Sequence, residues 1–173
     1  GFCPANTLKP YLDSVRTAIE EAFALQKPPS KNAERREKPQ VEVRTNADAL
    51  FESVTIKRTK FERAFIERSN NSTRISILIK QVDGMEEVMC HKFMRFLMQR
   101  AEDFQIMRRV PIEEYSISFL VTNNHLRNFT KKKIADFIIH FMTEVDKEIS
   151  EMKIEVNARS RFVATEFMRE FLV

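Results

Sequence analysis

The chain has 173 residues, 43% of them hydrophobic and 31% charged, with a net charge of +4 and a pI near 9.1. This is the composition of an ordinary water-soluble protein, long enough for one domain and an extension. Two cysteines are too few for a disulfide framework, and neither a leader peptide nor a membrane span is visible, so we expect a cytosolic protein. The two glycines, Gly1 and Gly84, cannot build the loops that cradle phosphates, which excludes P-loop and dinucleotide-binding enzymes and predicts no cofactor.

The N-terminal third is predicted to contain a helix, a linker and short strands. Residues 8–25 place apolar side chains on one face, and Pro10 suits the first turn of a helix. Prolines interrupt the charged segment 26–40, which predicts an extended linker. Alternating residues then predict short strands at 41–44 and 54–56.

The middle of the chain is predicted to supply most of a sheet. Strands are expected at 61–67 and 74–80, joined by a turn at 69–72 whose Ser and Asn residues favour turns. Two further strands are expected at 105–109 and 115–122.

A helix is expected between these two pairs of strands. Asp83 and Glu86 form a capping box at its start, and its buried face would hold Met85, Val88, Met89, Phe93, Phe96, Leu97 and Phe104. Strands grouped between helices predict an α+β fold with an antiparallel sheet, which occupies residues 1–130.

The C-terminal segment 131–173 is predicted to be a long helical extension of the same structural unit. Residues 131–171 contain no glycine or proline and would span ~60 Å as one helix, whereas a domain of the preceding size is only ~35 Å across. Apolar residues follow heptad spacing, interrupted at Arg159, and form what we call the heptad stripe: Ile138, Met142, Val145, Ile149, Met152, Val156 and Val163. Because water is a poor solvent for seven such side chains, we expect a partner subunit to cover the stripe.

Catalytic and metal-binding patterns are weak. Cys90 and His91 are adjacent, so on a helix they point about 100° apart, and a buried small side chain beside an imidazole is the better interpretation. His140 lies in an apolar stretch and is expected to be packed or interfacial rather than a base. His125 follows two asparagines and is interpreted as a helix-entry residue. No catalytic and no metal site is therefore predicted.

Basic residues are the ambiguous feature of the sequence. Lys131, Lys132 and Lys133 are best read as a solvated face. The other basic residues could either contact an acidic partner or be solvated, and they are Lys92, Arg95, Arg100, Arg108, Arg109, Lys153, Arg159 and Arg161.

Several motifs resemble a known family, the small scaffold subunit (subunit four) of the actin-related protein 2/3 complex. The resemblance covers nearly the whole chain from Leu8-Lys9-Pro10-Tyr11-Leu12 onward. It rests on Cys90-His91-Lys92-Phe93-Met94-Arg95-Phe96, Arg100-Ala101-Glu102, Arg108-Arg109, Ile117-Ser118-Phe119-Leu120, His140-Phe141-Met142, the run from Asp146 to Lys153, and Val156-Asn157-Ala158-Arg159. Two departures are Glu114, where the family has glycine, and Val110, where a basic residue is common.

The resemblance implies a non-enzymatic scaffold. Subunits of this type pair with subunit two of the complex through long C-terminal helices, hold the two actin-related proteins, and lie against the side of the mother actin filament from which a daughter filament branches. Carried over to this sequence, the filament contacts would be Arg108, Arg109, Lys153, Arg159 and Arg161, and the subunit interface would be the heptad stripe. Actin's acidic surface fits the sign of these charges.

Two other functions remain open from the residues alone. A homodimeric coiled-coil adaptor would explain the heptad stripe, and the isolated chain would then form a symmetric dimer. A nucleic-acid-binding module would explain the basic balance, although the 15 phenylalanines fall mostly at core spacing and there is no Trp to interleave with the charges.

Overall fold

The computed structural model describes residues 8–28, 38–79, 107–128, 130–147 and 150–151. In chain order the elements are α1 (Leu8–Leu25), α2 (Gln40–Val43), the 3-10 turn η1 (Ala47–Ala49), β1 (Leu50–Thr59), β2 (Glu62–Ser69), β3 (Ser72–Leu78), β4 (Met107–Arg109), β5 (Ile117–Thr122) and α4 (Asn123–Asn128). A further helix follows at 131–147. The predicted helix after Asp83, including Cys90 and His91, lies outside the described residues.

The strands form one antiparallel sheet in the order β1-β2-β3-β5-β4, which confirms the α+β prediction. The pairing of β2 with β3 places Ile66 opposite Ile75, and the pairing of β3 with β5 places Ile75 opposite Phe119. Because side chains alternate along a strand, this register brings one apolar row across the sheet on a single face, which we call the inner face.

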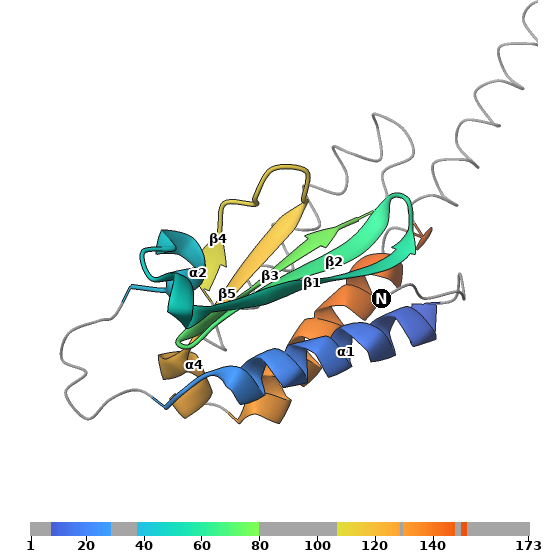
Figure 1. Ribbon diagram of the computed structural model, residues 1–173. Coiled ribbons are helices and arrows are strands. Elements are labelled where there is room, and N and C mark those ends of the chain that lie inside the picture. Colours follow the sequence, from blue (N-terminus) through green and yellow to red (C-terminus); the bar gives the residue numbers. More distant parts are fainter. Residues whose placement is uncertain (1–7, 29–37, 80–106, 129, 148–149, 152–173) are drawn as a thin grey trace, which may run out of the picture.

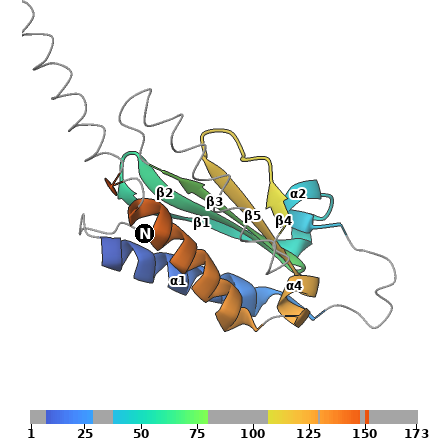
Figure 2. The ribbon, with the colours of Figure 1, turned by 180° about the vertical axis from the view of Figure 1, so that it is seen from behind.

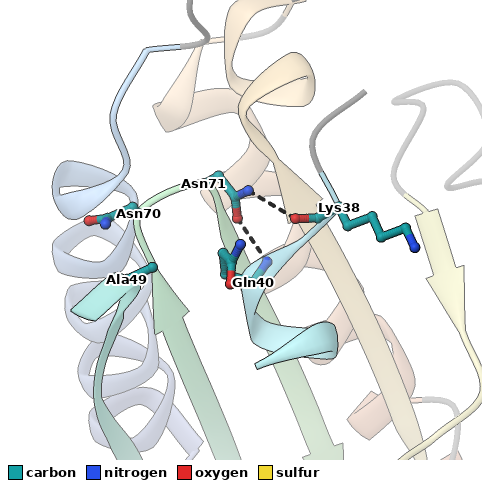
Figure 3. A pocket seen from close by; sticks show the side chains of 5 residues that line it. All are labelled: Lys38, Gln40, Ala49, Asn70 and Asn71. Atoms are coloured by element: carbon teal, nitrogen blue, oxygen red, sulfur yellow. Dashed lines mark hydrogen bonds between the residues drawn. The ribbon is translucent and has the colours of Figure 1, made fainter. Parts of the chain in front are cut away.

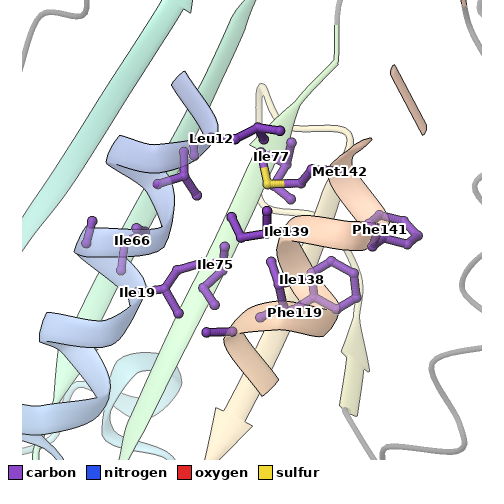
Figure 4. Packing of buried hydrophobic residues seen from close by; sticks show 14 of the residues in the cluster. Leu12, Ile19, Ile66, Ile75, Ile77, Phe119, Ile138, Ile139, Phe141 and Met142 are labelled. Atoms are coloured by element: carbon purple, nitrogen blue, oxygen red, sulfur yellow. The ribbon is translucent and has the colours of Figure 1, made fainter. Parts of the chain in front are cut away.

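Two helices cover the inner face. Figures 1 and 2 show α1 and the helix at 131–147 lying side by side beneath the sheet, on the side away from α2. Both contribute to the same core as the sheet, which Figure 4 shows from close by. The largest fully buried side chains come from the sheet and from both helices, and they include Phe23, Ile19, Ile66, Ile75, Phe119, Ile134 and Ile138.

The C-terminal end of α1 is fastened to the sheet by a buried polar contact. The amide of Gln26, which is 7% exposed, donates from Nε2 to Oγ1 of Thr73 at 2.7 Å and to the carbonyl oxygen of Val121 at 3.2 Å. The backbone N–H of Lys27 donates to the carbonyl of Asn70 at 2.7 Å. These bonds span two strands and the β2–β3 turn, so they hold the helix end in a defined place on the inner face.

The opposite face of the sheet, which we call the outer face, carries polar cross-strand pairs. Ser76 and Ser118 lie opposite each other, are both fully buried, and share a hydrogen bond of 2.8 Å. Glu67 faces Arg74 across the β2–β3 pairing, and Arg74 donates to its two carboxylate oxygens at 2.7 and 3.0 Å. Charge-assisted bidentate pairs of this kind are the stronger hydrogen bonds in proteins.

The prediction of a strand at 41–44 is wrong, because these residues form the helix α2. Asn71 of the β2–β3 turn accepts a hydrogen bond from the backbone of Gln40, while Pro39 precedes the helix. The helix ends at Arg44, which has a left-handed backbone (φ 48°) and pairs with Glu67. A segment whose residues alternate as in a strand thus forms a helix because of contacts with a distant turn, and Val41 is the residue of this helix that is buried.

Candidate functional site

The arginine pair Arg108–Arg109 lies on β4, at the end of the described sheet. Arg108 is opposite Phe119 and Arg109 is opposite Ser118 in the pairing with β5. The chain then enters a loop in which Val110 is 89% exposed and Pro111 is also exposed. The two arginines therefore lie on the last strand of the described sheet, and the loop that follows them is exposed. Lys153, Arg159 and Arg161 lie outside the described residues.

The heptad stripe divides into two parts, and this corrects the expectation for three of its members. Ile138, Met142 and Val145 are 0%, 7% and 4% exposed and belong to the chain's own core, where they pack against the inner face (Figure 4). Side chains covered in this way cannot contact another subunit. The other four residues, Ile149, Met152, Val156 and Val163, lie outside the described residues.

The remaining faces of this helix are turned away from the sheet. His140 is exposed, because Ile138, Ile139, Phe141 and Met142 take the inward positions around it. It is therefore not packed in the chain's own core, and the interfacial alternative stays a prediction. Residues 131–133 are exposed, which confirms the solvated face expected for the three lysines.

Ion pairs hold the helix at both ends of its described length. Near the start, Arg16 of α1 pairs with Asp136. Near the end, Arg58 of β1 donates to Oδ1 of Asp146 at 3.2 Å and lies 3.4 Å from Oε2 of Glu62. Sequence reasoning missed this second contact, because its members are 88 positions apart and no local pattern marks them.

Tyr11 of α1 lies buried near the Arg58 contact. Burial raises the pKa of its hydroxyl well above the ordinary value, the negative charge of Glu62 adds to that rise, and Arg58 opposes it. The ring is 4% exposed and belongs to the core cluster. The ion pair therefore stands at the rim of the core, where the surrounding protein screens it less than water would.

The loop between β4 and β5 carries a strained position. Glu114, which stands where glycine was expected, has a left-handed backbone with φ 72°. Arg63 at the start of β2 contacts this loop, with Nη2 3.4 Å from Glu114 and Nε 3.2 Å from the hydroxyl of Tyr115. The Tyr115 ring also stacks on Phe65 at 5.8 Å, so the loop keeps the shape that glycine would favour even though a side chain is present.

A polar depression of about 340 Å³ lies at the opposite end of the sheet and is lined by Lys38, Gln40, Ala49, Asn70 and Asn71. Figure 3 shows that the Asn71 side chain reaches from the β2–β3 turn to the segment that leads into α2. Its Nδ2 donates to the carbonyl of Lys38 at 3.0 Å, and its Oδ1 accepts from the backbone of Gln40 at 2.9 Å. The amide is therefore committed to holding the chain around α2, and we assign the depression a structural role.

His125 and the possible metal-binding groups lie partly within the described residues of the chain. His125 is 6% exposed and its Nδ1 accepts a hydrogen bond from the backbone N–H of Thr122 at 2.9 Å, which confirms its place at the entry of α4. Within the ranges that the structure describes, no group of three or more His, Cys, Asp or Glu side chains could hold a metal ion. In the same ranges, no helix combines the length and apolar character needed to cross a bilayer.

Comparison with known proteins points in one direction. Residues 4–170 match the family model described as ARP2/3 complex 20 kDa subunit (ARPC4). The chain is 50% identical over 165 residues to the probable actin-related protein 2/3 complex subunit 4 of Caenorhabditis elegans, covering 95% of this chain and 98% of the relative. It is 49% identical over 169 residues to subunit 4 of Saccharomyces cerevisiae (97% and 99% covered) and 48% identical over 162 residues to that of Dictyostelium discoideum (94% and 96% covered). The chain therefore belongs to the family of the ARP2/3 complex 20 kDa subunit, ARPC4.

Proposed function

We propose that this protein is a non-catalytic scaffold subunit of the actin-related protein 2/3 complex and acts in branched actin nucleation at the cytoplasmic actin cytoskeleton. The observation that carries the proposal is the identity of about 50% with subunits of that name along nearly the full length of both chains. Its partners are the other subunits, among them the actin-related proteins and subunit two, and the mother actin filament.

Pairing with subunit two is assigned to the C-terminal part of the heptad stripe. The chain's own sheet covers the stripe as far as Val145, and the same spacing continues in sequence with Ile149, Met152, Val156 and Val163. A stripe that begins inside one domain and continues in heptad spacing, apart from Arg159, calls for a second apolar surface. The helix of a partner subunit supplies that surface, so the interface consists of these last four residues.

Contact with the mother filament is assigned to the basic residues. Arg108 and Arg109 at the margin of the sheet, together with Lys153, Arg159 and Arg161 of the C-terminal segment, provide the positive charge. The exposed residues Val110 and Pro111 follow β4 directly, so a partner that reaches this loop would come close to the two arginines. Charge complementarity of this kind mainly sets association rate and specificity, and it weakens as salt rises.

The test replaces Arg108 and Arg109 with Ala in the reconstituted complex and measures co-sedimentation with filaments and branch density. Two lost charge contacts of about 0.5–1 kcal/mol each predict filament binding roughly tenfold weaker, with the complex still assembled and the difference shrinking at high salt. The matched control is Lys132→Ala with Lys133→Ala, which removes the same charge from a solvated face. Unchanged filament binding at low salt in the arginine variant would show that the filament assignment is wrong.

A further inference from the structure

The last described contacts between the helix at 131–147 and the sheet form a three-residue cluster. Arg58 near the end of β1, Glu62 at the start of β2 and Asp146 on the helix meet through one guanidinium nitrogen, at 3.4 Å from Glu62 and 3.2 Å from Asp146. Figures 1 and 2 both show the β1–β2 hairpin tip beside the end of this helix. The cluster thus joins the hairpin to the C-terminal end of the helix at 131–147.

The surroundings make this cluster more constraining than a surface ion pair. The side chains of Arg58 and Glu62 are 18% and 16% exposed, and that of Asp146 is 33% exposed. By comparison, the Arg16–Asp136 pair at the other end of the helix is 34% and 47% exposed. Partly buried charges are less screened, and one guanidinium held by two carboxylates restricts the helix in direction as well as in position.

Beyond Asp146, none of the described residues of the helix makes an apolar contact that could fix its direction. Among the described residues of the helix, Val145 is the last buried one, since Lys147, Ser150 and Glu151 are exposed. A helix fixed only by apolar packing can slide and tilt, because such contacts are not directional. Asp146 follows Val145 directly, so it is well placed to set the angle at which the helix leaves the sheet.

We propose that Arg58 and Glu62 hold Asp146 as an alignment contact that aims the C-terminal part of the heptad stripe at the partner subunit. The inference rests on the pairing proposed above and adds positioning residues that do not themselves touch the partner. A small change in angle would move the far end of the stripe by a large distance. From Val145 to Val163 a helix would extend ~27 Å, so a tilt of ~10° at Val145 would move its end by ~5 Å, about the width of a side chain. A partner that must match the stripe loses affinity when this angle is free to vary.

The experiment compares two identical substitutions on one helix in the reconstituted pair with subunit two. Asp146→Asn removes the negative charge from the alignment contact but leaves Arg58 beside Glu62, and Asp136→Asn removes the same charge from the Arg16 contact as the matched control. We expect Asp146→Asn to weaken the pair about tenfold, within the range typical of coupling between sites. We expect Asp136→Asn to change the affinity less than twofold, and Asp146→Glu, which keeps the charge, to recover most of the loss.

A second readout separates alignment from simple stability. Spin labels at Ser53→Cys and Lys147→Cys, both exposed sites, report the distance between β1 and the helix end in a chain with Cys3 and Cys90 replaced by Ala. The distance distribution should broaden in Asp146→Asn and stay narrow in Asp136→Asn. Equal affinity for wild type and Asp146→Asn, or equal effects of the two Asn variants in both readouts, would overturn the inference. Failure of the wild-type chain to bind subunit two would instead refute the proposed pairing.

Discussion

Glu67 offers the sharpest test of how the outer face of the sheet is held together. Its side chain is 7% exposed and takes both hydrogen bonds of Arg74, whose side chain is 15% exposed, while Arg44 approaches from α2 with 60% exposure. Glu67→Gln keeps the shape of the side chain but removes its charge. In the cluster of Arg44, Glu67 and Arg74, the buried guanidinium of Arg74 then has no negative charge to pair with.

The size of the loss follows from these exposures. Removing one member of a fully buried pair costs about 3–5 kcal/mol, and the partial exposure of Arg74 lowers the expected loss to about 3 kcal/mol. Arg44 is mostly in water, so Arg44→Gln, which keeps the left-handed position occupied by a residue of similar length, should cost less than about 1 kcal/mol. Each variant removes one charge from the same cluster, and the two replaced side chains differ mainly in how deeply they are buried.

Hydrogen exchange measured by mass spectrometry on the assembled complex gives the local stability of β2 and β3 directly. About 3 kcal/mol corresponds to exchange roughly a hundredfold faster in Glu67→Gln, with less than a tenfold change in Arg44→Gln. Joint replacement of Glu67 and Arg74 by Leu should recover much of the loss, since the charge of Arg44 that remains is mostly in water and no buried charge is left unpaired. If Glu67→Gln and Arg44→Gln accelerated exchange equally, burial would not be the reason for the stability of this cluster.

Two further predictions concern backbone strain and pH. Glu114→Gly should raise the melting temperature, because glycine adopts the left-handed backbone without strain. The free energy of unfolding should rise by about 0.5–1 kcal/mol after the loss of the exposed contact with Arg63 is subtracted. Glu114→Ala keeps the strain, so an equal gain in that variant would contradict the explanation. Because burial raises the pKa of Tyr11 above 10.0, the folded chain keeps a proton that the unfolded chain loses, so stability holds below pH 10.0 and falls above it. The slope should approach 1.4 kcal/mol per pH unit and flatten in Tyr11→Phe, as measured by urea unfolding between pH 9 and 11; an unchanged slope would show that another group controls it.

The sequence predicted the local features well where short-range chemistry decides the structure. The helix expected at 8–25 is α1, Leu8–Leu25, because its apolar period and its proline act within a few residues. The turn expected at 69–72 joins β2 to β3, since Ser and Asn hydrogen-bond to their own backbone there. His125 was placed at a helix entry because it follows two asparagines, and the structure adds that its Nδ1 accepts a hydrogen bond from the backbone N–H of Thr122.

Segment 41–44 needed the tertiary structure. Its alternating residues are compatible with a strand, and the contacts of Asn71 and Glu67 decide in favour of a helix. Those partners lie more than 20 positions away, at the β2–β3 hairpin, so no local pattern reveals them. The same holds for Arg58 and Asp146.

The heptad stripe shows most clearly what each level of information decides. By itself, the sequence determined that one face of the C-terminal helix must be covered, because regular apolar spacing marks a surface that avoids water. It did not determine what covers that face, since the hydrophobic effect is non-directional and a partner helix satisfies the pattern as well as the chain's own sheet. Only the tertiary structure assigned Ile138, Met142 and Val145 to the domain core, by bringing strands from earlier in the chain against them.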